Sequence, residues 1–491
     1  MTTNRQENQT VDTIKPVHSN WIIGILLGLA AVFGGILLAF GGPIAGVGAI
    51  LALAAAGAVL RDIEIGFWGV VLVVCLLPFA TIPVDIGLTP TLLDIIIAAT
   101  VGIWFLRLVT GQRREVVTSV ITVPLSIFIL VTLFAFIFGL ANGPLTANLI
   151  RHFAELLISI GFVLVIVDYF VNWDRIERIT KIIILSGAAA AAIAILFWLL
   201  PDLLTNDILN IFNRIGYPGG LVIRYIEDNP ELAERAIGTS VDPNSLGGLL
   251  LMIGALTGAQ VFSRKPLFRR WVIVAIFGVI LIAVVLTFSR GAMVGLIAGL
   301  LLIASARYRK LIPYMVLIAL LFLLLPFAQE YLARFAEGFQ GEDLATQMRF
   351  GEYRDTLALI GRYPIFGVGF AGSPDIDLYL GVANVYLTIG QQMGVVGLIA
   401  FFALLITLFG YAWINRGSFR ENERTDAIWL GLHAALVGGL AAGMFDHYLF
   451  NIDFHHAVTV FWLFIGLAAA STRVGRGSAR KLYRDEIRIN K

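Results

Sequence analysis

Apolar stretches long enough to cross a bilayer recur about fourteen times along the chain. A span of roughly 20 apolar residues matches a hydrocarbon core of about 30 Å. We expect spans near 21–41, 43–60, 65–82, 90–108, 119–140, 153–171, 180–200, 244–262, 271–288, 291–306, 311–328, 391–414, 427–445 and 455–471. The pattern predicts an all-α, polytopic integral membrane protein. Its single transmembrane domain covers 21–472, between a polar tail at 1–20 and a basic tail at 473–491.

Two connections are much longer than the rest, 201–243 and 329–390, and alternation of the spans puts both on the same side. Long loops in a compact membrane protein usually carry function. Four prolines predict a broken, extended path for the first loop. The second has helical spacing over 344–361, with Tyr353, Leu357 and Ile360 on one face and Arg349 and Glu352, with Thr356, on another.

Basic connections fall on every second side, so the positive-inside rule places both termini in the cytoplasm and the chain in the cytoplasmic membrane as a multi-pass protein. All lysines then lie inside: Lys15, Lys181, Lys265, Lys310, Lys481 and Lys491. The outer side carries arginines alone: Arg151, Arg214, Arg224, Arg235, Arg290, Arg334, Arg349, Arg354 and Arg362. A population of planar, bidentate donors on the translocated side indicates an outward-facing anion site, with phosphate as the usual ligand.

Composition agrees with a membrane protein, since 58% of residues are hydrophobic and 14% are charged. The formal charge of +2 gives no reason to expect a nucleic-acid partner. Cys75 is the one cysteine, which excludes internal disulfides and cysteine metal clusters.

The stretch from Arg235 to Asn244 enters a span from the outer side. Gly238 permits a tight turn, and Asp242 or Asn244 can cap the helix that follows. A helix N-terminus with an adjacent arginine is suited to anions. The alternative is an ordinary helix cap beside a surface arginine.

Arg290 sits at the apex of a very short hairpin between two apolar spans. An unpaired charge is costly at that depth, so we expect the side chain to point into the protein rather than to snorkel to the headgroups. Arg349 and Arg354 form a third basic group, which Glu352 and Asp355 could neutralise on a solvated helix face. Gly367 and Gly369 follow, and we interpret them as loop flexibility.

Further polar groups flank the outer ends of the spans. Asp446-His447 lies in the last outer turn, where the acid could orient the imidazole as a base for an acceptor hydroxyl, although histidines at helix ends often only cap or snorkel. Three other groups have an equally plausible structural role: His455-His456, Arg151 with His152 and Glu155, and Asp94, which could cap a helix after Pro90. Asp375 and Asp377 are spaced as a metal-binding pair, but no further ligand is evident, so we expect no metal and no cofactor.

Four motifs in order resemble the O-antigen ligase/polymerase family. They are Arg235–Asn244, Ser289–Gly291, Arg354–Phe370 and Asn384–Leu398, and the resemblance covers about 230–410. It implies an integral-membrane glycosyltransferase that uses a polyprenyl-diphosphate-linked glycan donor at the outer face of the cytoplasmic membrane. The acceptor is a lipid or another glycan, and chain-length regulators or flippases are possible partners.

By this resemblance Arg235 and Arg290 are expected catalytic residues, and the position of Asp446 and His447 in the outer turn adds that pair as the expected base. The expected substrate-binding residues are Arg349, Arg354, Asn244, Asn384 and Tyr386. Fixed positive charge at a departing diphosphate would stabilise the negative charge that develops there.

The chain departs from the ligase pattern at one position. Ala383 stands where ligases of the family place a histidine, and Gln392 where an acidic residue is common. We therefore prefer a polysaccharide polymerase over a ligase. Two alternatives remain: a transporter or flippase of an anionic or lipid-linked substrate, and a member that binds the glycan without transferring it. A transporter would place polar residues at the midplane of repeated halves, and the sequence shows no such repeat.

Overall fold

The computed structural model describes residues 28, 57–81, 89–112, 115–324, 344–372, 381–419 and 422–489. The chain divides into two units, 1–62 and 63–491, and the helices from α2 onward belong to the second. Three predicted site or loop residues lie outside the described residues: Arg334, Asp375 and Asp377. The expected span 21–41 also lies outside them except for residue 28, and the expected span 43–60 except for 57–60.

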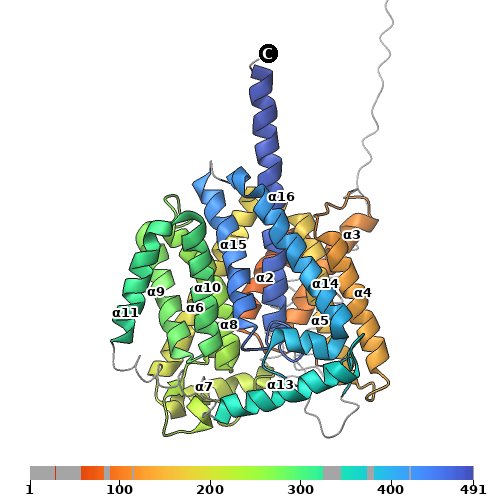
Figure 1. The fold of residues 1–491 in the computed structure, drawn as a ribbon, viewed down its shortest axis with the longest axis vertical. Coiled ribbons are helices and arrows are strands. Elements are labelled where there is room, and N and C mark those ends of the chain that lie inside the picture. Colours follow the sequence, from red (N-terminus) through yellow and green to blue (C-terminus); the bar gives the residue numbers. More distant parts are fainter. Residues whose placement is uncertain are drawn as a thin grey trace, which may run out of the picture. The chain divides into compact units, whose positions relative to one another are not determined.

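The second unit is a helical bundle (Figure 1). The helices that run along the bundle are α2 (Ile63–Leu76), α3 (Leu92–Val109), α4 (Thr122–Gly139), α5 (Ala147–Tyr169), α6 (Trp173–Leu199), α8 (Pro243–Phe262), α9 (Arg270–Leu286), α10 (Arg290–Arg307), α11 (Ile312–Leu323), α14 (Val385–Asn415), α15 (Glu423–Ala442) and α16 (His455–Ile489). Within the described ranges, nine helices are long and apolar enough to cross a membrane, and α2 and α9 are shorter apolar helices. The all-α, polytopic prediction is confirmed, and the total of fourteen spans stays a prediction.

The core of the bundle is built from α8, α10 and α15, which pack on one another, and from α16 against α5. Most of α8, α15 and α16 is buried, whereas α3 and α4 expose most of their surface, as helices that face lipid do. Glycines allow the closest approach: a Cβ on Gly295 of α10 would lie 2.5 Å from the carbonyl oxygen of Gly438 on α15. Small residues at helix crossings are the usual means of bringing spanning helices together.

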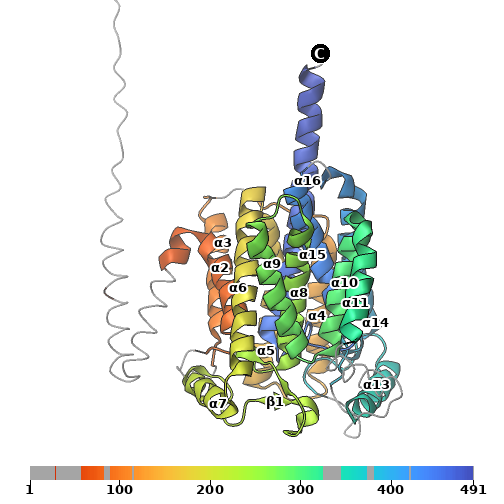
Figure 2. The same cartoon turned by 90° about the vertical axis from the view of Figure 1, so that its left-hand side faces the viewer.

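Two helices lie across one end of the bundle instead of along it, α7 (Asp202–Ile211) and α13 (Leu344–Arg362) (Figures 1 and 2). We call this the α13 end. The expected extended path at 201–243 is wrong in its first part, because the residues after Pro201 form α7. Pro201 fits there since proline is tolerated at the start of a helix. Beyond α7, a short antiparallel pair joins β1 (Arg224–Tyr225) to β2 (Glu234–Arg235).

The helical prediction over 344–361 is confirmed by α13, with a different division of its faces. Thr356 and Leu359 are buried, while Leu357 is 58% exposed. The face with Arg349, Glu352 and Thr356 therefore turns toward the bundle. On that side α13 packs on α14.

The glycines after α13 are packing positions, not flexible ones. α14 is broken at Gly394, which has φ 66° and ψ −166°. The main-chain N–H groups of Val368 and Gly369 donate to the carbonyls of Gln391 and Gln392 at 2.8 and 3.0 Å. A Cβ on Gly369 would lie 2.2 Å from the Cα of Gly139 on α4.

Substitution of Gly369 by alanine should therefore destabilise the protein by at least about 2 kcal/mol, because φ is +78° and the methyl group would meet backbone. The check is the thermal midpoint in detergent. Gly410→Ala is the matched control, since no atom lies within 4 Å of its added Cβ and α14 is helical there. Equal midpoints for the two variants would contradict the packing role.

Candidate functional site

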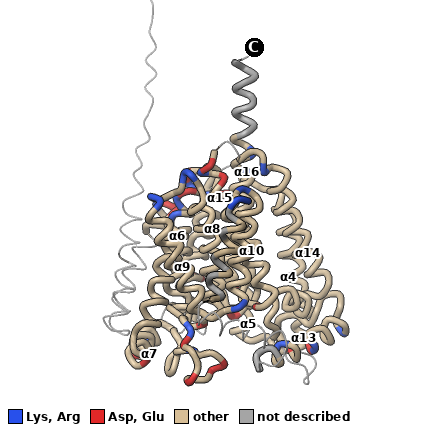
Figure 3. Tube along the Cα trace, turned by 60° about the vertical axis from the view of Figure 1, so that its left-hand side comes forward, with Lys and Arg blue, Asp and Glu red and all other residues tan. Residues whose placement is uncertain are grey.

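Most of the residues expected to bind or react with substrate meet at the α13 end. The starts of α8, α10 and α14 lie there, together with the turn that joins α15 to α16. Figure 3 shows charged residues at both ends of the bundle, including the α13 end.

Arg235 links the beginnings of two spanning helices. Its Nε donates to the carbonyl of Thr287 at 2.9 Å, just before α10, and its guanidinium also donates to Asn244 Oδ1 at 2.6 Å, in the first turn of α8. The main chain follows the same route, because Ala236 N donates to Leu286 O at 2.8 Å. The side chain is half-buried. Arg235 is therefore held by the protein and does not extend freely into solvent.

Asp242, not Asn244, caps α8: Oδ1 of Asp242 accepts from the main-chain N of Ser245 at 2.7 Å. Pro243 takes the first helical position, where a missing N–H costs nothing. This resolves the alternative between the two possible caps, and it leaves the Asn244 amide for Arg235.

Arg290 is the first residue of α10, and Ser289 caps that helix. Arg290 is half-buried, as the tight hairpin predicts for a side chain that is not fully solvated. Phe288 in the hairpin has φ 52°, an uncommon conformation for a bulky residue. Gly247 lets α8 approach this point, since its Cβ would lie 2.7 Å from Cβ of Ala292.

The turn between α15 and α16 supplies Asp446 and His447. The main-chain N of His447 donates to Asp446 Oδ1 at 2.8 Å, and His447 Nδ1 lies 3.5 Å from the same oxygen. The two side chains are close, but at 3.5 Å they form no well-directed hydrogen bond. Both are mostly buried, with 17% of the Asp446 side chain and 26% of the His447 side chain exposed.

Burial raises the pKa of Asp446 to about 7, a tendency opposed by the His447 main-chain donor and by the charges of Arg349 and Arg235. Burial lowers the pKa of His447 below its usual value, against the charges of Asp242 and Asp453. These influences place the acid, the imidazole and two of the expected arginines within electrostatic reach of one another. A carboxyl group that titrates near neutral pH is a typical property of reactive sites.

Tyr448 completes this group and was not among the residues predicted for the site. Burial raises the pKa of the Tyr448 hydroxyl, and the side chains of Asn244 and Asp242 lie close enough to act on it. Its position directly after Asp446-His447 is the one sequence feature that could have indicated a role in the site. It connects the α15–α16 turn to the start of α8.

Two arginines of α13 have different environments. Arg349 is half-buried, and its charge acts on Asp446, His447 and Tyr353. Arg354 is exposed. Of the two expected contacts, Arg349 is therefore the one that faces the group around Asp446.

The start of α14 is bound to the end of α15. Asn384 caps α14 by accepting from the N of Leu387 at 3.0 Å, and its Nδ2 donates to Met444 O at 2.9 Å. The Tyr353 hydroxyl of α13 lies 3.5 Å from the same Met444 carbonyl. Tyr386 donates its hydroxyl to Leu440 O at 2.8 Å and stacks on Phe402, so the structure shows a packing role for it. Contact of Asn384 or Tyr386 with substrate stays a prediction.

Ala383, at the position of the histidine in ligases of the family, lies under α13. Its N donates to Glu352 Oε2 at 3.1 Å, and its carbonyl accepts from the Tyr353 hydroxyl at 3.4 Å.

A pocket opens beside these residues. It is small, with a cavity volume of about 20 Å³. Its polar wall comes from Asn244, Ser289, Asp446 and Tyr448, and small residues of α10 and α15, such as Gly291 and Gly443, form much of the remainder. Arg290 lies between two lining residues, Ser289 and Gly291, without lining the pocket itself.

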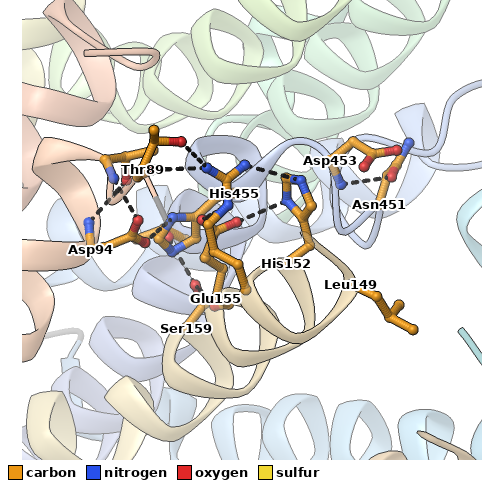
Figure 4. A network of polar contacts seen from close by, with 12 residues as sticks. Thr89, Asp94, Leu149, His152, Glu155, Ser159, Asn451, Asp453 and His455 are labelled. Carbon is orange, nitrogen blue, oxygen red and sulfur yellow. Dashed lines mark hydrogen bonds and ion pairs between the residues drawn. The ribbon is translucent and has the colours of Figure 1, made fainter. Parts of the chain in front are cut away.

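A second polar cluster lies at the starts of α3, α5 and α16 (Figure 4). Asp94 caps α3 through Thr91, as expected after Pro90, and also lies 3.0 Å from Nδ1 of His455. Arg151, His152 and Glu155 interact with one another in the first turns of α5. This cluster shares no residue with the pocket.

The arrangement around the pocket suits an anionic substrate and proton transfer. Two helix N-termini, with their partial positive charge, meet beside a guanidinium. An acid that titrates near neutral pH stands close to them, which is the combination that general acid–base catalysis requires.

Residues 273–402 match the family model described as O-antigen ligase. No curated protein sequence matches the chain. The matched segment runs from α9 to α14, so it includes Arg290, Arg349 and Asn384, whereas Arg235, Asn244 and the Asp446 turn lie outside it. With its many apolar helices long enough to cross a membrane, the chain is a multi-pass membrane protein, and its residues 273–402 are similar to the O-antigen ligase family.

Proposed function

We propose that the protein is a glycosyltransferase that transfers or polymerises a polyprenyl-diphosphate-linked oligosaccharide at the outer face of the cytoplasmic membrane. Polymerase is the preferred form and ligase the second. The α13 end then faces outward and both termini lie in the cytoplasm, as the distribution of lysines indicates. The transporter alternative is not favoured, because residues 273–402 match an O-antigen ligase model and the candidate residues gather at one end of the bundle.

The observation that carries the proposal is the link made by Arg235 between the starts of α8 and α10. A diphosphate bound here would meet a guanidinium, two helix N-termini and Arg290 in the first turn of α10. Arg349 would approach from α13, which lies across the same end.

The reaction then follows from the positions of these groups. An acceptor hydroxyl attacks the anomeric carbon of the donor sugar, and the bond from that carbon to the diphosphate oxygen breaks. The polyprenyl diphosphate leaves with the electron pair, stabilised by the arginines. The hydroxyl proton passes to the Asp446–His447 pair. No step requires a metal or a nucleotide.

Purified protein in liposomes should convert a polyprenyl-diphosphate-linked oligosaccharide into polymer or into a glycan linked to an added lipid acceptor. The size and linkage of the product distinguish a polymerase from a ligase. A matched donor with a monophosphate should react much more slowly, because it presents fewer oxygens to the arginines. Absence of any product with several donors, from protein that remains folded, would contradict the proposal.

The two arginines of α13 provide an internal comparison. Arg349→Ala should raise KM for the donor about tenfold, the loss expected for a charge-assisted hydrogen bond. Arg354→Ala should change it less than about twofold, because an exposed charge contributes little. Steady-state kinetics on both variants tests this, and equal effects would show that Arg349 has no special position.

A further inference from the structure

The polar cluster at the starts of α3, α5 and α16 brings three possible metal ligands together. Asp94, Glu155 and His455 each offer one ligand atom, and these atoms all lie within 4.8 Å of one another. They come from three helices that are far apart in sequence (Figure 4). Among the described parts of the chain, this is the one group of His, Cys, Asp and Glu residues with that geometry.

Asp94 is fixed by its own helix. Its Oδ2 accepts from the main-chain N of Thr91 at 2.7 Å, in the capping box of α3. Its Oδ1 is left pointing toward His455, with Nδ1 of that ring 3.0 Å away. The cap therefore orients one carboxylate oxygen into the cluster.

Glu155 is oriented by His152. A guanidinium can only donate, so the 3.1 Å contact between Arg151 and His152 Nε2 makes that nitrogen an acceptor. The ring proton is then on Nδ1, which donates to Glu155 Oε2 at 3.0 Å. The other oxygen, Oε1, has no hydrogen bond in the described structure. A hydrogen-bonded carboxylate with one oxygen directed inward is typical of a metal ligand with its supporting partner.

His455 provides the observation that points to a ligand. The residue is 7% exposed, and neither ring nitrogen has a hydrogen-bond partner of acceptable geometry within the described structure. Buried polar atoms are nearly always bonded, so an unbonded imidazole nitrogen facing two carboxylates needs a partner.

We infer that Asp94, Glu155 and His455 bind a divalent transition-metal ion of the zinc class. One nitrogen and two carboxylate ligands suit zinc better than magnesium or calcium, which prefer all-oxygen sites. Two atoms that each bind one ion at about 2.1 Å can lie no more than about 4.2 Å apart. The ligand atoms here lie within 4.8 Å of one another, so the side chains would move slightly closer together on binding. The ion would join α3, α5 and α16, and His456, the residue after His455, extends the link to α8 through Ser245 at 2.8 Å. The site is separate from the transfer chemistry and does not rest on it.

One positive charge opposes the ion. Arg151 Nε lies 3.5 Å from Glu155 Oε1, while its other nitrogens are engaged by Thr89 and His152. The competing arrangement is an internal ion cluster, in which a protonated His455 bridges the two carboxylates and no metal binds. The two arrangements differ in what removal of Arg151 does to zinc binding. A metal site should bind zinc more tightly, whereas an internal ion cluster should show no gain in zinc binding.

The test is titration of metal-depleted, full-length protein in detergent with Zn²⁺, against a chromophoric chelator. We expect one equivalent of zinc per chain in the wild type, with no displacement by excess Mg²⁺. Asp94→Asn and Glu155→Gln should each weaken binding at least tenfold, and Arg151→Gln should strengthen it several-fold by removing the opposing charge. Asp453→Asn, an exposed acid of the turn before α16, should bind as the wild type does.

Because a ligand variant could fail to fold, two measurements use intact protein. X-ray absorption of the zinc-loaded wild type should show only nitrogen and oxygen ligands, and zinc should raise its thermal midpoint. The inference is overturned if the wild type binds no stoichiometric zinc, if binding survives Asp94→Asn combined with Glu155→Gln, or if Arg151→Gln fails to strengthen it.

Discussion

Replacement of Arg235 by alanine should lower the turnover of a polyprenyl-diphosphate-linked donor by roughly 10³-fold, the loss typical of removing a group that stabilises developing negative charge. The side chain donates to Thr287 O and Asn244 Oδ1, so its removal takes away the charge and also the tie between α8 and α10. Arg235→Lys should recover only a small part of the rate, because an ammonium cannot donate in two fixed directions.

The matched control is Arg224→Ala on the paired strand. Arg224 lies directly opposite Arg235 in the β1–β2 pair, but its side chain is 52% exposed and contacts only Asp228, at 3.8 Å, among the described ion pairs. Its removal should leave turnover within about twofold of the wild type. Donor binding and thermal midpoints, measured on each variant, separate loss of chemistry from loss of structure. Retention of more than a tenth of wild-type turnover by Arg235→Ala would remove it from the catalytic group.

Asp446→Asn should lower the rate by roughly 10²- to 10³-fold and abolish a pH step that the wild type shows near neutrality. The pKa of this acid is raised to about 7, so it is protonated below that pH and ionised above it. If the carboxylate takes the acceptor proton, activity rises as pH increases through about 7. Rates from pH 5.5 to 8.5 in both proteins give the measurement.

Stability provides the complementary check on Asp446. Because its pKa is higher in the folded than in the unfolded chain, folding stability should fall as pH rises from the unfolded pKa through about 7. Asp446→Asn should remove that contribution and be at least as stable as the wild type at pH 8. Asp453→Asn, in the same turn, should keep both the rate and the pH step. A step that persists in Asp446→Asn would assign it to another group.

The sequence predicted the elements that hydropathy and helix capping determine. The last twelve expected spans correspond to described helices, and the helix at 344–361 is present as Leu344–Arg362. Of the alternatives that the sequence left open, Asp242 caps α8, and Asp94 completes the capping box of α3 behind the N-cap Thr91. These features depend on neighbours within a few residues, which a single chain displays directly. The extended interpretation of 201–243 was wrong because α7 forms from local propensity between its prolines.

The site features that the sequence did not predict depend on packing between segments far apart in the chain. Tyr448 joins the site because it lines the same pocket as Asn244, a residue about two hundred positions earlier. Tyr386 lies in a family motif, yet its hydroxyl donates a hydrogen bond to the main-chain carbonyl of Leu440. The choice between Arg349 and Arg354 depended on which face of α13 turns to the bundle, a matter of tertiary contact and not of spacing.

The break in α14 at Gly394 affects which parts of the family resemblance can be taken as signs of activity. The stretch Pro364-Ile-Phe-Gly-Val-Gly-Phe370 is one of the most recognisable parts of that resemblance, yet its glycines serve to fit backbone against α4 and into the gap of α14. A break in a helix leaves carbonyls without their helical partners, and this segment donates to two of them, those of Gln391 and Gln392. Its signature is therefore a steric requirement of the scaffold. A chain could retain it unchanged after losing every reactive side chain, so the arginines and the Asp446 turn, not this signature, are the positions from which activity in a relative should be judged.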